Sequence, residues 1–235
     1  MSQPSRATTL RAKVRAEMVE EIKATARRHL AEQGASNLSL RAVARDMGFV
    51  SSAIYRYFAS RDELLTALII DAYNALGAAA EAAEAAVDRA DLAGRFAAIC
   101  HAVRDWARAN PHEYALIYGT PVPGYQAPQD TIGPATRVTN LLGAILVDGC
   151  ATGALHAPAD EWLAPTVAAE MAHIRDSIFP GVPPTLLARG LIAWTELFGA
   201  VSFEIFNRLD GIVVDRDAWF EYQVIALTHF IGALP

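Results

Sequence analysis

The 235-residue sequence has little cysteine, few charges and no long apolar run. Its two cysteines, Cys100 and Cys150, cannot form a disulfide framework, and neither lies in a metal-binding spacing. No run approaches the roughly eighteen consecutive apolar residues of a membrane span. Residues 1–10 are polar and carry arginine, unlike a secretory signal. These absences favour a water-soluble, cytoplasmic protein with no membrane partner.

The charges that are present are distributed unevenly. Residues 1–61 contain eleven Lys/Arg and five Asp/Glu, a balance of +6, whereas residues 62–235 contain nine and twenty-one, a balance of −12. A basic region on an acidic chain favours phosphate binding by the basic region alone, because the rest of the chain repels phosphate. The alternative is uneven solvation of two ordinary helical regions.

The hydrophobic period is helical almost throughout. Val14, Met18, Ile22 and Ala26 recur every four residues and predict a helix from about residue 11 to residue 33, with Gly34 as its stop. Pro111 suits the first turn of a helix, and Asp215 suits a helix N-cap. The expected further helices cover about 60–90, with 75–90 as an exposed end, and then 92–109, 111–118, 135–150, 159–179, 184–209 and 216–233. The predicted fold class is all-α.

Residues 38–58 carry the strongest local pattern. Ser39 is a candidate cap for a short helix that ends at Gly48, and a second short helix follows with Ile54 and Phe58 facing inward. Two short helices joined by a tight turn with glycine form a helix-turn-helix. The outward face can donate to phosphates and base edges, through Ser51, Ser52, Tyr55, Arg56 and Tyr57. The alternative is a helical hairpin whose polar groups face water.

Residues 11–70 resemble the N-terminal domain of the tetracycline-repressor (TetR) family of bacterial transcriptional regulators. The specific part is the run YRYFASRDELL at residues 55–65. Position by position, the resemblance implies that Arg41 reaches a base edge, that Tyr55 and Tyr57 hold phosphates, and that Arg61 lies against the DNA backbone. Val50 and Ser52 depart from the family pattern and leave the start of the recognition helix uncertain. The expected DNA contacts are Ser39, Arg41, Ser51, Ser52, Tyr55, Arg56, Tyr57 and Arg61.

The resemblance also implies how the chain divides. Residues 1–61 would form a three-helix DNA-binding domain, continuous through a fourth helix from about residue 60 with an effector-binding and dimerisation bundle at 62–235. Residues 106–114, 119–125 and 194–199 resemble one C-terminal type within the family. The candidate effector contacts are Trp106, Tyr114, Tyr118, Trp194 and Phe198. Such aromatics can equally be core residues.

The last two long helices carry more apolar residues than one monomer needs to bury, including Ile192, Val201, Val224 and Ile225. This surplus favours a two-fold homodimer, and burial within the monomer is the alternative. No glycine-rich phosphate loop or G-x-S-x-G motif is present, and Glu170 with His173 is only half of a di-iron pattern. No enzyme, metal or cofactor is expected.

The function expected from the resemblance is a repressor that leaves a palindromic double-stranded DNA operator when an unknown small molecule binds. An activator or ligand-independent regulator is the first alternative, and a helical enzyme with a DNA-binding region is a remote one.

Overall fold

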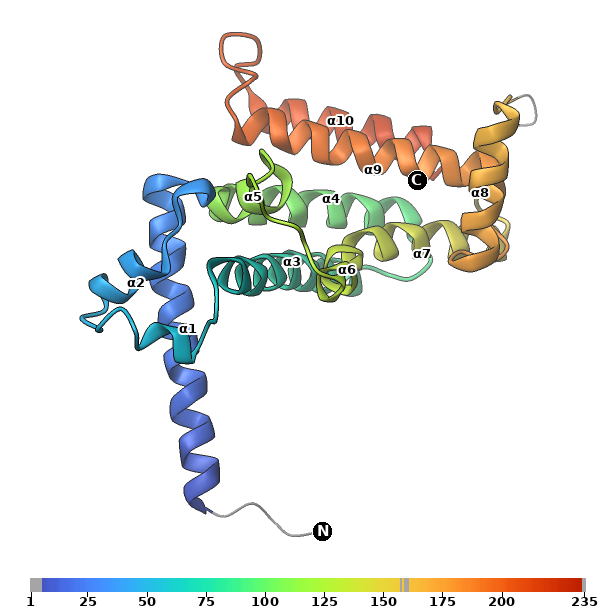
Figure 1. Ribbon diagram of the computed structural model, residues 1–235. Helices are drawn as coiled ribbons and strands as arrows, with labels where there is room; N and C mark the ends of the chain where they lie inside the picture. Colours follow the sequence, from blue (N-terminus) through green and yellow to red (C-terminus); the bar gives the residue numbers. More distant parts are fainter. Residues whose placement is uncertain (1–5, 157, 159–160, 234–235) are drawn as a thin grey trace. The chain divides into compact units, whose positions relative to one another are not determined.

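The computed structural model describes residues 6–156, 158 and 161–233, which form helices and turns with no β-strand among them (Figure 1). The ten α-helices of these residues are α1 (Arg6–Gln33), α2 (Leu40–Asp46), α3 (Arg61–Ala85), α4 (Leu92–Ala109), α5 (Pro111–Tyr118), α6 (Ile132–Ala135), α7 (Arg137–Thr152), α8 (Pro165–Ser177), α9 (Pro184–Ile205) and α10 (Arg216–Phe230). Three 3-10 turns are η1 (Ala35–Asn37), η2 (Ile54–Arg56) and η3 (Gln129–Thr131). The predicted all-α class is confirmed.

The chain forms two compact units. The head unit consists of residues 6–73 and 110–132, and the body unit consists of residues 74–109 and 133–233. The head unit therefore extends past the predicted boundary at residue 61 and includes a second segment, which carries α5 and η3. The assignment of DNA binding to 1–61 and of effector binding to 62–235 stays a prediction.

The head unit is built on the predicted apolar positions. Ile22 and Ala26 of α1 are fully buried, as are Val43 and Ala44 of α2. The same core also contains Leu30, Leu38, Leu40, Ile54, Phe58, Leu64, Leu65, Leu68 and Val122. The predicted stripe of α1 does not hold along its whole length, because Val14 is 51% exposed. The N-terminal half of α1 runs out beyond the core of the head unit (Figure 1).

The body unit packs α4 and α9 at its centre. Both contact α7 and α10, and α9 also contacts α8. Ile99, Ile145, Leu186 and Val201 are fully buried among these helices. By length and composition, α3 and α9 could each cross a membrane. Both instead bury one side against helices of this chain, which is the arrangement of core helices.

The prediction that residues 75–90 are the exposed end of a helix is only partly correct. α3 ends at Ala85, and Leu76 and Ala80 are buried. Gly77 packs under the side chain of Arg137, where an added Cβ would lie only 2.7 Å from Nε. The lack of a side chain at Gly77 therefore lets Arg137 approach the backbone of α3.

The helix ends follow the expected local chemistry. Gly34 adopts φ 76° after α1, Pro111 begins α5, and an Asp215 carboxylate oxygen accepts the Ala218 N–H at 2.9 Å. α9 ends at residue 205 rather than 209 because Asn207 adopts a left-handed φ of 56°. α8 begins at residue 165, and its expected start at residue 159 lies outside the described residues.

Candidate nucleic-acid interface

The predicted helix-turn-helix is present in the head unit. Gly48 adopts φ 71° after α2, and the N–H of Phe49 bonds the carbonyl of Ala44 at 2.8 Å, which closes the helix end. The second element is shorter than predicted, because Ile54–Arg56 forms a 3-10 turn instead of an α-helix. Val50 offers no capping side chain, and a helix this short is readily held by i→i−3 bonds. The N–H of Tyr57 accordingly bonds the carbonyl of Ile54 at 2.9 Å.

Several cations of the head unit are neutralised inside it. Arg27 donates to Asp71 at 2.7 Å and to Glu113 at 2.9 Å, joining α1, α3 and α5. Lys23 lies 2.8 Å from the same Asp71 carboxylate. Burial lowers the pKa of Lys23, but the hydrogen bonds to Asp71 and Glu20 outweigh it, so the pKa is raised overall. These groups hold the head unit together.

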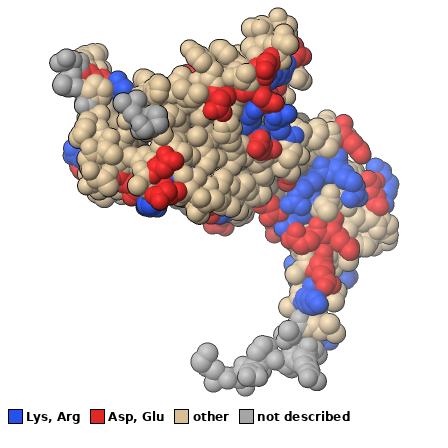
Figure 2. Space-filling model, turned by 180° about the vertical axis from the view of Figure 1, so that it is seen from behind, with Lys and Arg blue, Asp and Glu red and all other residues tan. Residues whose placement is uncertain are grey.

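A second set of cations is exposed. Arg41 and Arg45 on α2 and Arg56 on η2 all reach solvent, and within the described part of the chain their side chains have no ion-pair or hydrogen-bond partner. Tyr55, which directly precedes Arg56, is 45% exposed, and Ser51 and Ser52 are exposed in the preceding turn. On the face shown in Figure 2, basic side chains gather on the head unit next to acidic ones.

Ser39 and Tyr57 are half-buried, in contrast to the exposed contacts of α2 and η2. Ser39 occupies the N-cap position of α2, but its side chain makes no capping hydrogen bond. The Tyr57 ring packs against the head core, and the Arg15 guanidinium lies over it at 5.2 Å from the centroid. Arg15 also donates to the carbonyl of Arg56 at 2.8 Å. Arg15 thereby connects α1 to η2, the second element of the helix-turn-helix.

Arg61, which the resemblance to the TetR family places against the DNA backbone, is bonded to protein carbonyls. Its Nε donates to Leu38 at 3.0 Å, and its Nη2 donates to Ala35 at 2.9 Å and to Ser36 at 3.1 Å. These bonds tie the start of α3 to η1 and to the entry of α2. The geometry favours a role in positioning the helix-turn-helix over a direct contact with phosphate.

Two family models match the chain. The model for bacterial regulatory proteins of the tetR family matches residues 22–68, and the tetracyclin repressor-like C-terminal domain matches residues 96–227. The chain belongs to the tetR family. It is a DNA-binding transcriptional regulator with an N-terminal helix-turn-helix. Regulators of this family bind DNA operators and form dimers, and they are not enzymes.

Relatives of known sequence and structure agree with this tetR assignment. The helix-turn-helix-type transcriptional regulators Rv1816 of Mycobacterium tuberculosis and Mb1846 of Mycobacterium bovis are each 40% identical over 209 residues, 88% of either chain. The crystal structure of regulatory protein SCO4313 is 36% identical with a TM-score of 0.76, covering 97% of this chain and 100% of that one. PfmR, a TetR family transcriptional regulator of Thermus thermophilus, shares the fold at 20% identity and a TM-score of 0.56, with coverages of 88% and 96%.

The five predicted effector contacts of this tetR protein are divided between the two units, two in the head unit and three in the body unit. Tyr114 is fully buried in the head unit, and its ring centroid lies 5.1 Å from that of Tyr118. Burial raises the pKa of Tyr118, as do the neighbouring Tyr73 and Tyr114. The other three belong to the body unit, where Trp194 and Phe198 lie on α9 with centroids 5.9 Å apart and Trp106 lies on α4.

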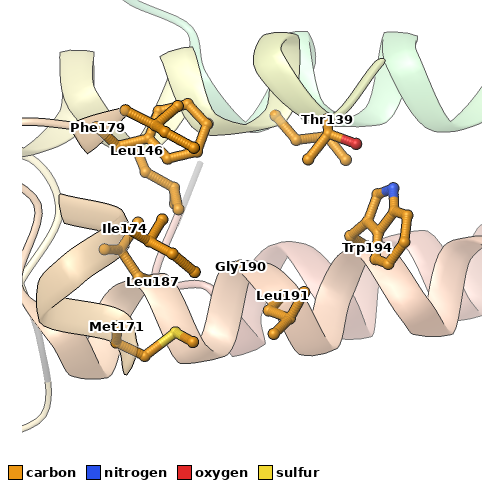
Figure 3. A pocket seen from close by; sticks show the side chains of 12 residues that line it. Thr139, Leu146, Met171, Ile174, Phe179, Leu187, Gly190, Leu191 and Trp194 are labelled. Atoms are coloured by element: carbon orange, nitrogen blue, oxygen red, sulfur yellow. The ribbon is translucent and has the colours of Figure 1, made fainter. Parts of the chain in front are cut away.

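Trp194 is the member of this set that lines the cavity between α7, α8 and α9, whose volume is about 180 Å³ (Figure 3). The other residues around this cavity were missed from the sequence. Thr139, Leu142 and Leu146 on α7 have spacings of three and four residues, and a buried core face shows the same spacings. Periodicity alone therefore could not separate this cavity wall from solid core.

Several large apolar side chains are exposed on the outward sides of α9 and α10, next to polar residues such as Thr195 and Glu221. Phe203 on α9 is 55% exposed, and Trp219 and Tyr222 on α10 are also exposed, with their rings stacked at 5.7 Å. Gly199 lies between exposed positions of α9, and an added Cβ there would meet nothing within 4 Å.

Proposed function

We propose that this protein represses transcription by binding as a homodimer to a palindromic operator in the cytoplasm, and that a small molecule bound in the body unit releases it. The observation that carries the proposal is the exposed set of Arg41, Arg45, Arg56 and Tyr55 on the helix-turn-helix. These side chains have no partner in the described residues, although acidic groups elsewhere in the head unit neutralise other cations.

Each predicted DNA contact has a role that fits its surroundings. Arg41 is the base reader, because a guanidinium can bond both O6 and N7 of guanine. Tyr55 and Arg56 hold phosphates, assisted by the hydroxyls of Ser51 and Ser52. Ser39 and Tyr57 contribute at the edges of this surface. Arg61 acts from within, by fixing α3 to the entry of α2.

The homodimer is proposed to form through α9 and α10. Their buried sides pack within the body unit, and their outward sides present Ile192, Phe203, Trp219, Tyr222 and Ile225. Two copies that placed these faces together would form a four-helix interface of the kind that two-fold symmetry allows. Gly199 would let the opposing helices come close.

The proposed DNA binding is tested by incubating the purified full-length protein with genomic fragments and sequencing those it retains. The expected result is one pseudo-palindromic site, protected in footprinting as two half-sites related by a dyad. Arg41→Ala should retain these fragments more weakly and relax the selection at one base pair in each half-site, whereas Arg175→Ala, a half-exposed arginine of the body unit, should leave the selection unchanged. Retention of fragments with no shared sequence would contradict the proposal.

Repression is tested by placing the selected site upstream of a reporter promoter. Expression of the protein should lower reporter transcription, because a bound dimer blocks the polymerase. A rise in transcription would instead identify an activator.

The dimer is tested with Gly199→Trp, which fills the proposed interface without a clash inside the protomer. Light scattering should show a shift from dimer to monomer, with a parallel loss of operator affinity. Gly133→Trp is the matched control, because its added side chain also starts in open space. A Gly199→Trp protein that remains dimeric would place the interface elsewhere.

A further inference from the structure

The cavity of the body unit has a shape that two glycines maintain. α7 and α9 line it from opposite sides, and α8 and Phe179 close it. A Cβ at Gly143 would overlap the Phe179 ring, and a Cβ at Gly190 would lie 2.6 Å from Leu146 Cδ1. Larger residues at these positions would push Phe179 and Leu146 aside, and both line the cavity. Because Gly143 and Gly190 have no side chains, Phe179 and Leu146 can pack against them and form part of the cavity wall.

The cavity has the size of a small ring compound. Its volume is about 180 Å³. Apolar cavities of about 150 Å³ in other proteins remain dry and bind benzene. A drug-sized ligand needs roughly 300 Å³ or more. A molecule with one aromatic ring and one or two small substituents therefore fits this space.

The polar atoms of the cavity are few and lie together. Among its described lining residues no side chain is charged, and the hydrogen-bonding side chains are the Thr139 hydroxyl and the Trp194 indole. In Figure 3, both lie at one end of the cavity, whereas Met171, Ile174 and Leu187 lie at the other. Neither polar group has a hydrogen-bond partner within the described residues.

We propose that this cavity binds a small uncharged molecule with one aromatic ring and a single hydrogen-bonding oxygen, which lies against Thr139 and Trp194. Thr139 can donate or accept and the indole donates, so a hydroxyl or carbonyl oxygen suits both. A carboxylate or an amine would lose its hydration without meeting an opposite charge, and burial of an unpaired charge is strongly unfavourable.

The ligand can reach the cavity from solvent. Leu191 and Ile178 line it and are respectively 44% and 57% exposed, so they mark its opening. This inference rests on the proposed function in one respect, namely that such a ligand is the effector that changes DNA binding. Binding itself can be measured on the protein without DNA, which keeps the two questions separate.

The first experiment compares three probes by isothermal titration and thermal denaturation of the full-length protein. p-Cresol has the ring and one hydroxyl, toluene lacks the oxygen, and benzoate is charged. We expect p-cresol to bind and raise the Tm, toluene to bind about fivefold more weakly because one hydrogen bond is missing, and benzoate not to bind. Failure of p-cresol to bind, or equal binding of benzoate, would overturn the proposal.

Two pairs of variants locate the binding site. Thr139→Val removes the hydroxyl at nearly constant volume, and should weaken p-cresol about fivefold while toluene is unaffected. Thr152→Val makes the same change on the same helix, where the hydroxyl bonds the Asp148 carbonyl, and should alter neither probe. Ile174→Trp places a bulky ring system in the cavity and should abolish binding of both, whereas Val167→Trp on the exposed side of α8 should not.

The operator measurement separates the two proposals. If p-cresol binds in the cavity and weakens operator binding, both stand. If it binds without changing operator affinity, the ligand class stands and release by this ligand fails. If operator binding is intact but neither p-cresol nor toluene binds, or Ile174→Trp binds them normally, the cavity is not the ligand site and the DNA-binding function is unaffected.

Discussion

The arginines of the helix-turn-helix and those at the centre of the body unit have different surroundings. In the body unit, Arg95 is fully buried and bonds Glu84 at 2.6 Å and Asp148 at 2.9 Å. Arg104 is likewise paired with Glu204 and Asp217. In the head unit, Arg41 and Arg56 project into solvent without an acidic partner in the described residues. The guanidinium group therefore stabilises the fold at Arg95 and Arg104, whereas at Arg41 and Arg56 it is exposed to solvent.

This difference refines what the charge pattern means. The excess of acid after residue 61 is more than a solvated surface, because part of it neutralises buried guanidinium groups. The pKa of Asp217, for example, is lowered chiefly by its hydrogen bond to Arg104. The basic excess before residue 62 is divided between internal ion pairs of α1 and exposed groups of α2 and η2. Net charge therefore indicates the basic region of the chain, and local pairing separates its exposed cations from those bonded within the fold.

The largest expected effect that tests this contrast is the salt dependence of operator binding. Two heads in a dimer would neutralise about 6–10 phosphates, so operator affinity should fall by about 10³–10⁵ between roughly 50 and 200 mM salt. The measurement is fluorescence anisotropy with labelled operator DNA over that range. A nearly flat dependence would mean that the exposed arginines do not bind phosphates.

The next effect is on stability and concerns the body unit. Arg95→Ala should lower the free energy of unfolding by about 3–5 kcal/mol, because Glu84 and Asp148 lose their buried partner. Arg41→Ala should change it by less than about 0.5 kcal/mol, as surface substitutions usually do. Chemical denaturation of both variants checks this. Similar losses in the two variants would remove the contrast between paired and exposed arginines.

Within the head unit, a smaller effect separates base reading from phosphate binding. Arg41→Ala should cost about 1–3 kcal/mol on the best operator and relax the preference at one base pair in each half-site. Tyr55→Phe should weaken binding to all sequences about equally, since it removes only a hydroxyl that bonds phosphate. Selection from randomised half-sites measures both. A full base preference in Arg41→Ala would show that Arg41 is not the reader.

The smallest effect distinguishes positioning from direct DNA binding among the head arginines. Arg61→Ala should lower head stability by about 1–2 kcal/mol, because three carbonyls lose their donor. Arg56→Ala should leave stability unchanged and reduce the slope of log affinity against log salt by about 1 for each phosphate that is no longer neutralised. If Arg61→Ala reduces the slope and spares stability, Arg61 binds phosphate after all.

Most of the fold could be predicted from the sequence because helical periodicity and helix stops are local properties. The stripe at Ile22 and Ala26, the Asp215 cap and the glycine after α2 are all as expected. The errors have two sources. The burial of Leu76 depends on neighbours that a local pattern does not contain. The 3-10 form of η2 and the left-handed Asn207 after α9 are local backbone conformations that the hydrophobic period does not specify.

The candidate site could be predicted only as a set of residue types. Arg41 and Arg61 look equivalent in the sequence, since each is a basic residue near a helix start. The structure separates them because the carbonyls of residues 35, 36 and 38 converge on Arg61 alone among the head arginines that the structure describes. In the same way, Tyr114 and Trp194 are both aromatic residues on helices, but one is solid core and the other lines a cavity.

The composition of the head unit from two stretches of chain has a consequence for its synthesis. The polypeptide leaves the head unit after residue 73, returns at residue 110 and leaves again after residue 132. Val122 belongs to the head core, and Glu113 supplies an ion-pair partner of Arg27. A nascent chain that has emerged only to residue 73 therefore lacks part of its own interior. The head unit can therefore complete its core only after α4, a helix of the body unit, has left the ribosome.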